Sequence, residues 1–140
     1  MDYIRDRKNN LSFSLHDSRI LKMEIGKANL SLKIDRIFQY SDDEEKWYPG
    51  TIEFTKVDIE ECDIMVFNTP FGYDGEKSFS GKTLYVEEFN ALYPDVEFEI
   101  VSEAYNGYDT VYQGWIWQEE NDPLFGIMRI WNTGDMIYHI

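Results

Sequence analysis

The sequence has little cysteine, little histidine and no long apolar run. A single cysteine in 140 residues excludes an intramolecular disulfide framework and a zinc site built from several cysteines. Two histidines cannot supply a three-histidine metal site. No segment of about 18 apolar residues is present, and the charged start lacks the apolar core of a signal peptide. We therefore expect a soluble, cytoplasmic protein without a metal or other cofactor.

Basic side chains are scarce after residue 56. Residues 1–56 balance ten basic against ten acidic side chains, whereas residues 57–140 have three basic and seventeen acidic ones, so the net charge of -14 arises there. This sign repels phosphates, so neither nucleic acid nor an anionic membrane surface is an expected partner. An acidic surface can instead steer a basic protein towards it. The alternative is that the acidity serves solubility alone.

A hydropathy period of two dominates the chain and predicts β-strands. The clearest alternating segments are 11–15, 21–25, 30–34 and 96–100. The polar turn at 26–29 predicts a hairpin, and Asn106-Gly107 predicts a second one. Eight or nine such strands indicate a mainly β fold, an antiparallel sheet that is curled or folded as a sandwich. No linker divides residues 1–140, so a single domain is expected.

Three further features complete the expected fold. The apolar phase slips by one position near Lys56, which predicts a bulge or a strand break. One short helix is expected at about 84–92, with Thr83 as its cap. Residues 124–131 and 136–140 are expected to pair as a final hairpin.

A phosphate-binding loop is suggested by Gly81-Lys82-Thr83 but lacks the required spacing. The motif needs a glycine five positions before Gly81, where this chain has Glu76. The segment follows a turn-rich stretch, 68–82, that is expected to be the longest loop. We therefore do not expect nucleotide binding.

Other catalytic residue types also lack a suitable arrangement. His16, Asp17 and Ser18 are adjacent, and neighbours on an extended chain point in opposite directions, so we expect a structural corner in place of a triad. Cys62 lies in an apolar strand beside carboxylates, which disfavour a thiolate. Paired carboxylates such as Glu97 and Glu99 are typical of a solvated strand face. The prediction is that the protein is not an enzyme.

Aromatic residues are concentrated near the end of the chain. Eight fall within 34 residues: Tyr105, Tyr108, Tyr112, Trp115, Trp117, Phe125, Trp131 and Tyr138. Strand parity places Trp115 and Trp117 on one face and Tyr112 on the other. Both faces cannot be wholly buried in a chain of this size, so some rings are expected to be exposed. Exposed Trp and Tyr in an acidic setting are typical of a protein-binding hot spot, although they could also stack on sugars.

The segment Phe13-Ser14-Leu15-His16-Asp17-Ser18-Arg19-Ile20, with the hairpin at 21–34 that follows it, resembles the opening of a group of small bacterial proteins. These are immunity-type proteins of polymorphic toxin systems, which begin with a Phe-x-x-His-Asp-(Ser/Ala) corner. The resemblance implies a noncatalytic role in which an acidic surface occludes a basic toxin. It carries over no catalytic residue.

The sequence therefore predicts a noncatalytic acidic protein-binding domain, an immunity protein that acts as an antitoxin by occluding a basic toxin. The residues expected to contact the partner flank the aromatic cluster, and they are Glu97, Glu99, Glu103, Tyr108, Asp109, Trp117, Glu119, Glu120 and Asp122. Three alternatives stay open. They are a β domain that binds carbohydrate or another small ligand, a hydrolase that uses carboxylates, and a subunit whose aromatic surface forms a homo-oligomer.

Overall fold

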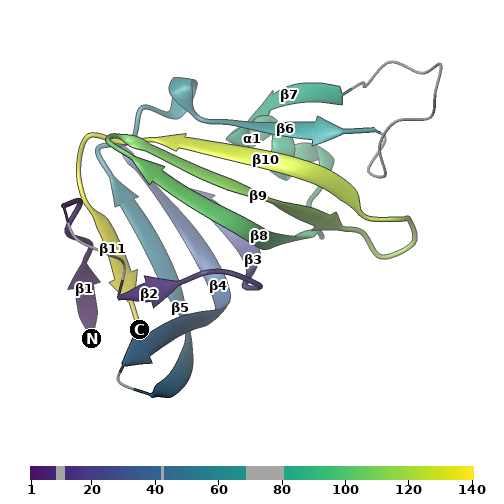
Figure 1. Ribbon diagram of the computed structural model, residues 1–140. Helices are drawn as coiled ribbons and strands as arrows, with labels where there is room; N and C mark the ends of the chain where they lie inside the picture. Colours follow the sequence, from purple (N-terminus) through teal and green to yellow (C-terminus); the bar gives the residue numbers. More distant parts are fainter. Residues whose placement is uncertain (9–11, 42, 69–80) are drawn as a thin grey trace.

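One antiparallel sheet forms the body of the protein (Figure 1). The structure is a computed structural model that describes residues 1–8, 12–41, 43–68 and 81–140. Its strands are β1 (Asp2–Ile4), β2 (Phe13–Ser14), β3 (Arg19–Ile25), β4 (Asn29–Ser41), β5 (Glu44–Thr55), β6 (Asp63–Phe67), β7 (Gly81–Tyr85), β8 (Glu97–Asn106), β9 (Asp109–Trp117), β10 (Leu124–Trp131) and β11 (Met136–His139). Their order in the sheet is β1-β11-β5-β4-β3-β8-β9-β10-β6-β7, and β2 pairs with β4. The expectation of a mainly β, curled antiparallel sheet is confirmed.

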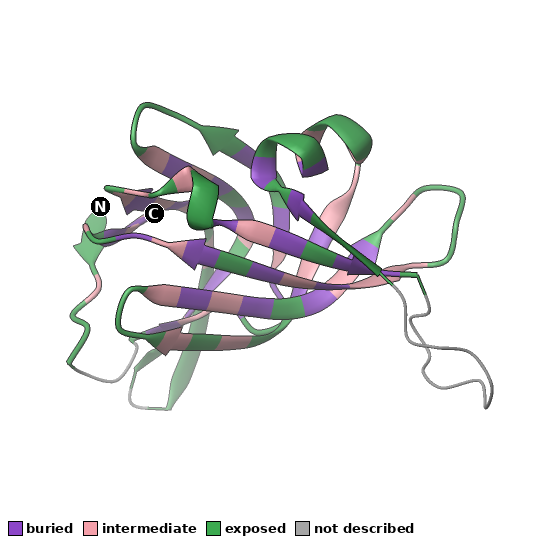
Figure 2. Cartoon of the chain, turned by 90° about the horizontal axis from the view of Figure 1, so that it is seen from above, coloured by how far each residue is buried: buried purple, intermediate pink, exposed green. Residues whose placement is uncertain are grey.

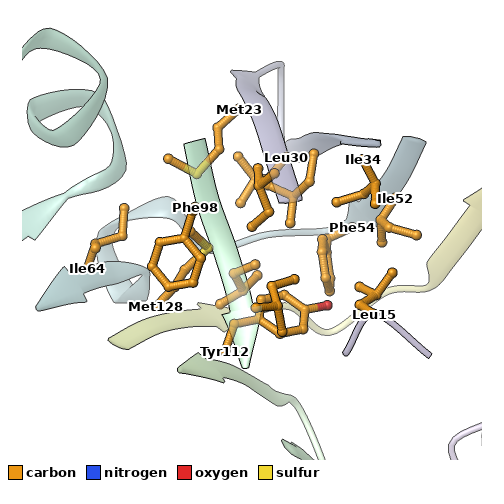
Figure 3. Packing of buried hydrophobic residues seen from close by; sticks show 14 of the residues in the cluster. Leu15, Met23, Leu30, Ile34, Ile52, Phe54, Ile64, Phe98, Tyr112 and Met128 are labelled. Atoms are coloured by element: carbon orange, nitrogen blue, oxygen red, sulfur yellow. The ribbon is translucent and has the colours of Figure 1, made fainter. Parts of the chain in front are cut away.

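The sheet curls around a single hydrophobic cluster of the described residues. Buried and exposed positions alternate along the strands (Figure 2), because successive side chains point to opposite faces. Phe98 and Met128 on one half of the sheet lie across the core from Ile52 and Phe54 on the other (Figure 3). The inner face is therefore the core, and the outer face is exposed to solvent.

Two of the three expected hairpins form. β3 pairs with β4, and β8 pairs with β9 through a turn in which Gly107 has a φ of +61°. The expected hairpin of 124–131 with 136–140 is wrong, since β10 pairs with β9 and β6, whereas β11 pairs with β5 and β1. The turn between β10 and β11 thus leads the chain from one half of the sheet to the other.

The expected helix is present as α1 (Val86–Leu92). It begins after Tyr85, and the expected cap Thr83 instead lies in β7 opposite Met65, so that expectation is wrong. A strand partner therefore outweighs the capping preference of Thr83. Helix α1 packs against β3, β6 and β7, and the Asn90 side-chain amide donates a 3.1 Å hydrogen bond to the Met23 carbonyl. The helix thereby covers the part of β3 that β8 does not reach.

The expected strand break at Lys56 is confirmed. Its φ is +49°, β5 ends at Thr55, and Val57 makes only an isolated bridge to Asn132. A short 3₁₀ helix, η1 (Ile59–Glu61), follows. Most of the loop expected at 68–82 lies outside the described residues, and its last two positions belong to β7.

The corner at 15–18 forms, but its side chains have different roles from those expected. Asp17 has a left-handed backbone with a φ of +66°, which brings its carboxylate to 3.0 Å from Nδ1 of His16. The two side chains therefore meet although they are adjacent, and both are more than half exposed. The buried group is Ser18, whose hydroxyl donates to the Arg36 carbonyl at 2.5 Å. Ser18 thus supplies the buried hydrogen bond, and it cannot also act as an exposed nucleophile.

Candidate functional site

The register of β8 and β9 places Glu97 directly opposite Trp117 on the outer face of the sheet. Arg19 from β3 joins them, with its guanidinium 2.7 Å from the Glu97 carboxylate and 5.1 Å from the centre of the Trp117 ring. The Trp117 indole N–H also donates a 3.3 Å hydrogen bond to Glu99. These contacts orient a ring that remains 37% exposed. Four side chains from three strands thus form one fixed surface cluster, the Trp117 cluster.

More carboxylates surround this cluster. The connection from β9 to β10 has Glu119, Glu120 and Asp122, and it projects beyond the sheet on the right of Figure 1. A groove of about 260 Å³ separates this connection from the end of α1, and Asp95 and Glu119 are among its lining residues. We call this groove the acidic groove, and we call the six carboxylates around Trp117 the acidic end: Asp95, Glu97, Glu99, Glu119, Glu120 and Asp122.

Tyr108 and Asp109 lie far from the acidic end. They flank the opposite end of the β8–β9 hairpin, and the ten residues of β8 span about 30 Å. Asp109 is engaged by two guanidinium nitrogens of Arg129, at 2.8 and 3.3 Å. The Tyr108 ring meets the Trp131 ring edge-on and lies under the guanidinium of Arg7. The structure therefore separates these two residues from the others predicted to bind a partner.

Glu103 is also separated from the acidic end, because a bulge in β8 reverses the faces to which the following side chains point. The register shifts between Ile100 and Ser102, so Glu103 turns to the inner side of the sheet. Its carboxylate accepts hydrogen bonds from the Leu15 N–H at 2.7 Å, the Ser14 hydroxyl at 3.1 Å and the Tyr105 hydroxyl at 2.9 Å. Glu103 thus joins β8 to the segment that contains β2, and it is not part of the acidic end.

The most enzyme-like cluster lies elsewhere on the outer face. His139 contacts Asp2 through Nδ1 at 2.8 Å and Glu53 through Nε2 at 2.9 Å. The hydrogen bonds to Glu53 and then to Asp2 raise the pKa of His139 above 6.5. Because both ring nitrogens are engaged, neither is available to take a proton from a substrate. The cluster instead links β5, β11 and β1.

Two other chemical candidates have no catalytic geometry. Cys62 is fully buried, and burial raises the pKa of its thiol, which disfavours the thiolate. The described residues hold no group of three or more His, Cys, Asp or Glu side chains that could bind a metal ion.

In the same part of the chain, no helix has the length and apolar character needed to cross a membrane.

Two members of this surface were not predicted. Arg19 comes from a strand about eighty positions earlier than Glu97, and the sequence contains no signal for that strand pairing. Asp95 is two residues before Glu97 and shares its parity, which could have indicated a common face. Comparison with known proteins adds no further information, because no family model, curated protein or solved structure matches the chain.

Proposed function

We propose that this protein binds a basic protein partner through its acidic end and acts as an immunity-type inhibitor of a toxin. The observation that carries the proposal is the concentration of carboxylates around Trp117, an exposed aromatic ring held in a defined orientation. Aromatic residues of this kind are enriched among the residues that dominate binding energy. The surrounding charge accelerates encounter with a positive surface.

Inhibition would occur by occlusion. Carboxylates of the acidic end would pair with the lysine and arginine residues that the toxin uses to hold its substrate, and Trp117 would anchor the contact. Direct catalysis is not required, which agrees with the engaged nitrogens of His139 and the burial of Cys62.

Sugar binding is less well supported by the same geometry. A sugar stacks on an open aromatic face, whereas the Arg19 guanidinium lies over the Trp117 ring. A hydrolase with two carboxylates needs one of them in an apolar pocket, with a raised pKa. Glu97 and Glu99 instead lie on the outer face, bound to Arg19 and Trp117.

The test is the association rate with the product of the adjacent upstream gene, since an immunity gene normally follows its toxin gene. Between 50 and 500 mM salt the Debye length shortens from about 14 to about 4 Å, so the rate should fall steeply. Replacing Glu119, Glu120 and Asp122 with their amides should reproduce that fall at low salt. These side chains lie in a connection, so the free energy of unfolding should change by less than about 0.5 kcal/mol per position.

The matched control neutralises three carboxylates where the chain turns from β4 into β5: Asp43 between the strands, and Glu44 and Glu45, the first two residues of β5. This turn lies at the lower left of Figure 1, away from the acidic end. An equal loss with both triplets would mean that total charge alone matters, and it would refute a localised surface. A rate that depends on neither salt nor the two triplets would assign the acidity to solubility. A mass measurement in solution would show whether the surface instead pairs two copies of this chain.

A further inference from the structure

An apolar pocket of about 220 Å³ opens between α1 and the strands β3 and β8. The pocket forms because β8 pairs with β3 only at Arg19 and Ile20. Beyond these residues the two strands diverge, and α1 packs over the gap between them. Its lining includes core residues, among them Met23, Phe89 and Phe98, which are at most 7% exposed. The pocket is thus an indentation into the hydrophobic core.

Two polar side chains that line the pocket already have partners. The Asn90 amide donates to the Met23 carbonyl, and the Lys22 ammonium lies 2.7 Å from the Glu24 carboxylate. An occupant therefore gains from apolar contact and has little to gain from added hydrogen bonds. A cavity of about 150 Å³ is enough to hold benzene, so this pocket has room for a leucine- or phenylalanine-sized group.

The pocket adjoins the acidic groove. Tyr93, Pro94 and Val96 line both, so an occupant of the pocket lies beside Asp95 and Glu119. On the helix side, Lys82 stands 5.6 Å from the centre of the Tyr93 ring, where it is engaged with that aromatic face. A ligand that extends from the pocket into the groove therefore passes from an apolar to a negatively charged environment.

We propose that this pocket receives one large apolar side chain of the partner, while lysine or arginine residues next to it in the partner occupy the acidic groove. The inference rests on the proposed function and specifies the partner segment that the acidic end recognises. An extended chain advances about 3.3 Å per residue, so the basic residues should fall within about three positions of the apolar one. Apolar contact provides the anchor, and charge complementarity selects the partner over apolar segments that lack basic residues.

The test selects binders to the full chain from a random dodecapeptide phage library and measures the enriched peptides by fluorescence polarisation. Enriched sequences should contain Leu, Ile, Met or Phe within about three positions of two or more Lys or Arg. Replacing the apolar residue of such a peptide with alanine should weaken binding by about tenfold or more.

Substitutions at the rim test the pocket: Leu21 lines the pocket alone, whereas Val96 also lines the acidic groove. Val96→Phe and Leu21→Trp should each lower the affinity for the enriched peptide about tenfold. In each variant the enriched peptide should then bind no more tightly than the version in which its apolar residue is replaced with alanine. Two positions are used so that one variant remains informative if the other fails to fold. Val101→Phe is the matched control, since Val101 is an exposed position of β8 that does not line the pocket, and it should have no effect.

Replacing Asp95, Glu119 and Glu120 with their amides should reduce the salt dependence of binding. The protein should still prefer the peptide that contains the apolar residue over the alanine-substituted version. If basic peptides bind equally well with and without the apolar residue, or if Val96→Phe and Leu21→Trp leave binding unchanged, the pocket inference is wrong and the proposed function stands. If the enriched peptides lack Lys and Arg, the proposed function fails, and the inference fails with it.

Discussion

Removing the Glu103 carboxylate should destabilise the protein. Glu103→Ala deletes the acceptor of three hydrogen bonds, including the one to the Leu15 N–H at 2.7 Å. Leu15 is fully buried, so its N–H would lose its acceptor in a place that water reaches poorly. A hydrogen bond to a charged group contributes roughly 1.5–3 kcal/mol, and the three bonds share one carboxylate, so the expected loss is about 3 kcal/mol. Glu103→Gln keeps a carbonyl oxygen for the Leu15 N–H and should lose about half as much.

Urea and thermal unfolding monitored by circular dichroism would measure this loss, which corresponds to a fall in melting temperature of roughly 10 °C. The matched control is Glu99→Ala, which removes a carboxylate from the outer face of the same strand and should change stability by less than about 1 kcal/mol. If Glu103→Ala melts like the unmodified protein but no longer binds the partner, Glu103 belongs to the binding surface and its structural role is refuted.

Three further predictions concern single side chains. The raised pKa of His139 contributes stability below pH 6.5 that is lost as the pH rises through the raised value, so the melting temperature should decline with pH across neutrality in the unmodified protein and much less in His139→Gln. Among the described residues the buried Tyr138 hydroxyl has no hydrogen-bond partner, so Tyr138→Phe should leave stability unchanged or raise it by about 1 kcal/mol in urea unfolding, whereas Tyr112→Phe should lower it by about 1 kcal/mol. Ser18→Ala should lower the free energy of unfolding by about 1–2 kcal/mol and His16→Ala by less than about 0.5 kcal/mol, and the reverse order would contradict the assignment of the buried hydrogen bond to Ser18.

Local patterns in the sequence were sufficient to predict most strands but not all of their partners. Alternation identifies a segment such as 96–100, and Asn106-Gly107 identifies a turn, because both depend on neighbouring residues. The false hairpin of 124–131 with 136–140 shows the limit. A polar turn between two apolar segments is compatible with a hairpin and also with a passage between sheet halves, and only the packing of the core decides between them.

The candidate binding surface was predictable to a similar extent. Parity correctly separates Trp117 from Tyr112, since facing follows from position in the strand. Parity predicts the wrong face for Glu103, because the bulge after Ile100 reverses the faces to which the following side chains point. No residue in that segment indicates a bulge. The apolar pocket could not be predicted, because it depends on how a helix packs over two diverging strands.

The narrow connection between β3 and β8 has a consequence for cooperativity. Among the described residues, the sheet is continuous there only through residues 19–20 and two backbone hydrogen bonds between the Asp17–Ser18 corner and Ile100. Strands β6 to β10 follow one another in the chain and form one half of the sheet. In the sequence they lie between β5 and β11, which both belong to the other half. Such a unit can open as a foldon, so the amides of β9 and β10 should exchange with deuterium together, at a lower opening free energy than those of β4 and β5. Mutual repulsion of the carboxylates in that half would widen the difference at low ionic strength, and the proposed binding face would then belong to the less stable half of the molecule.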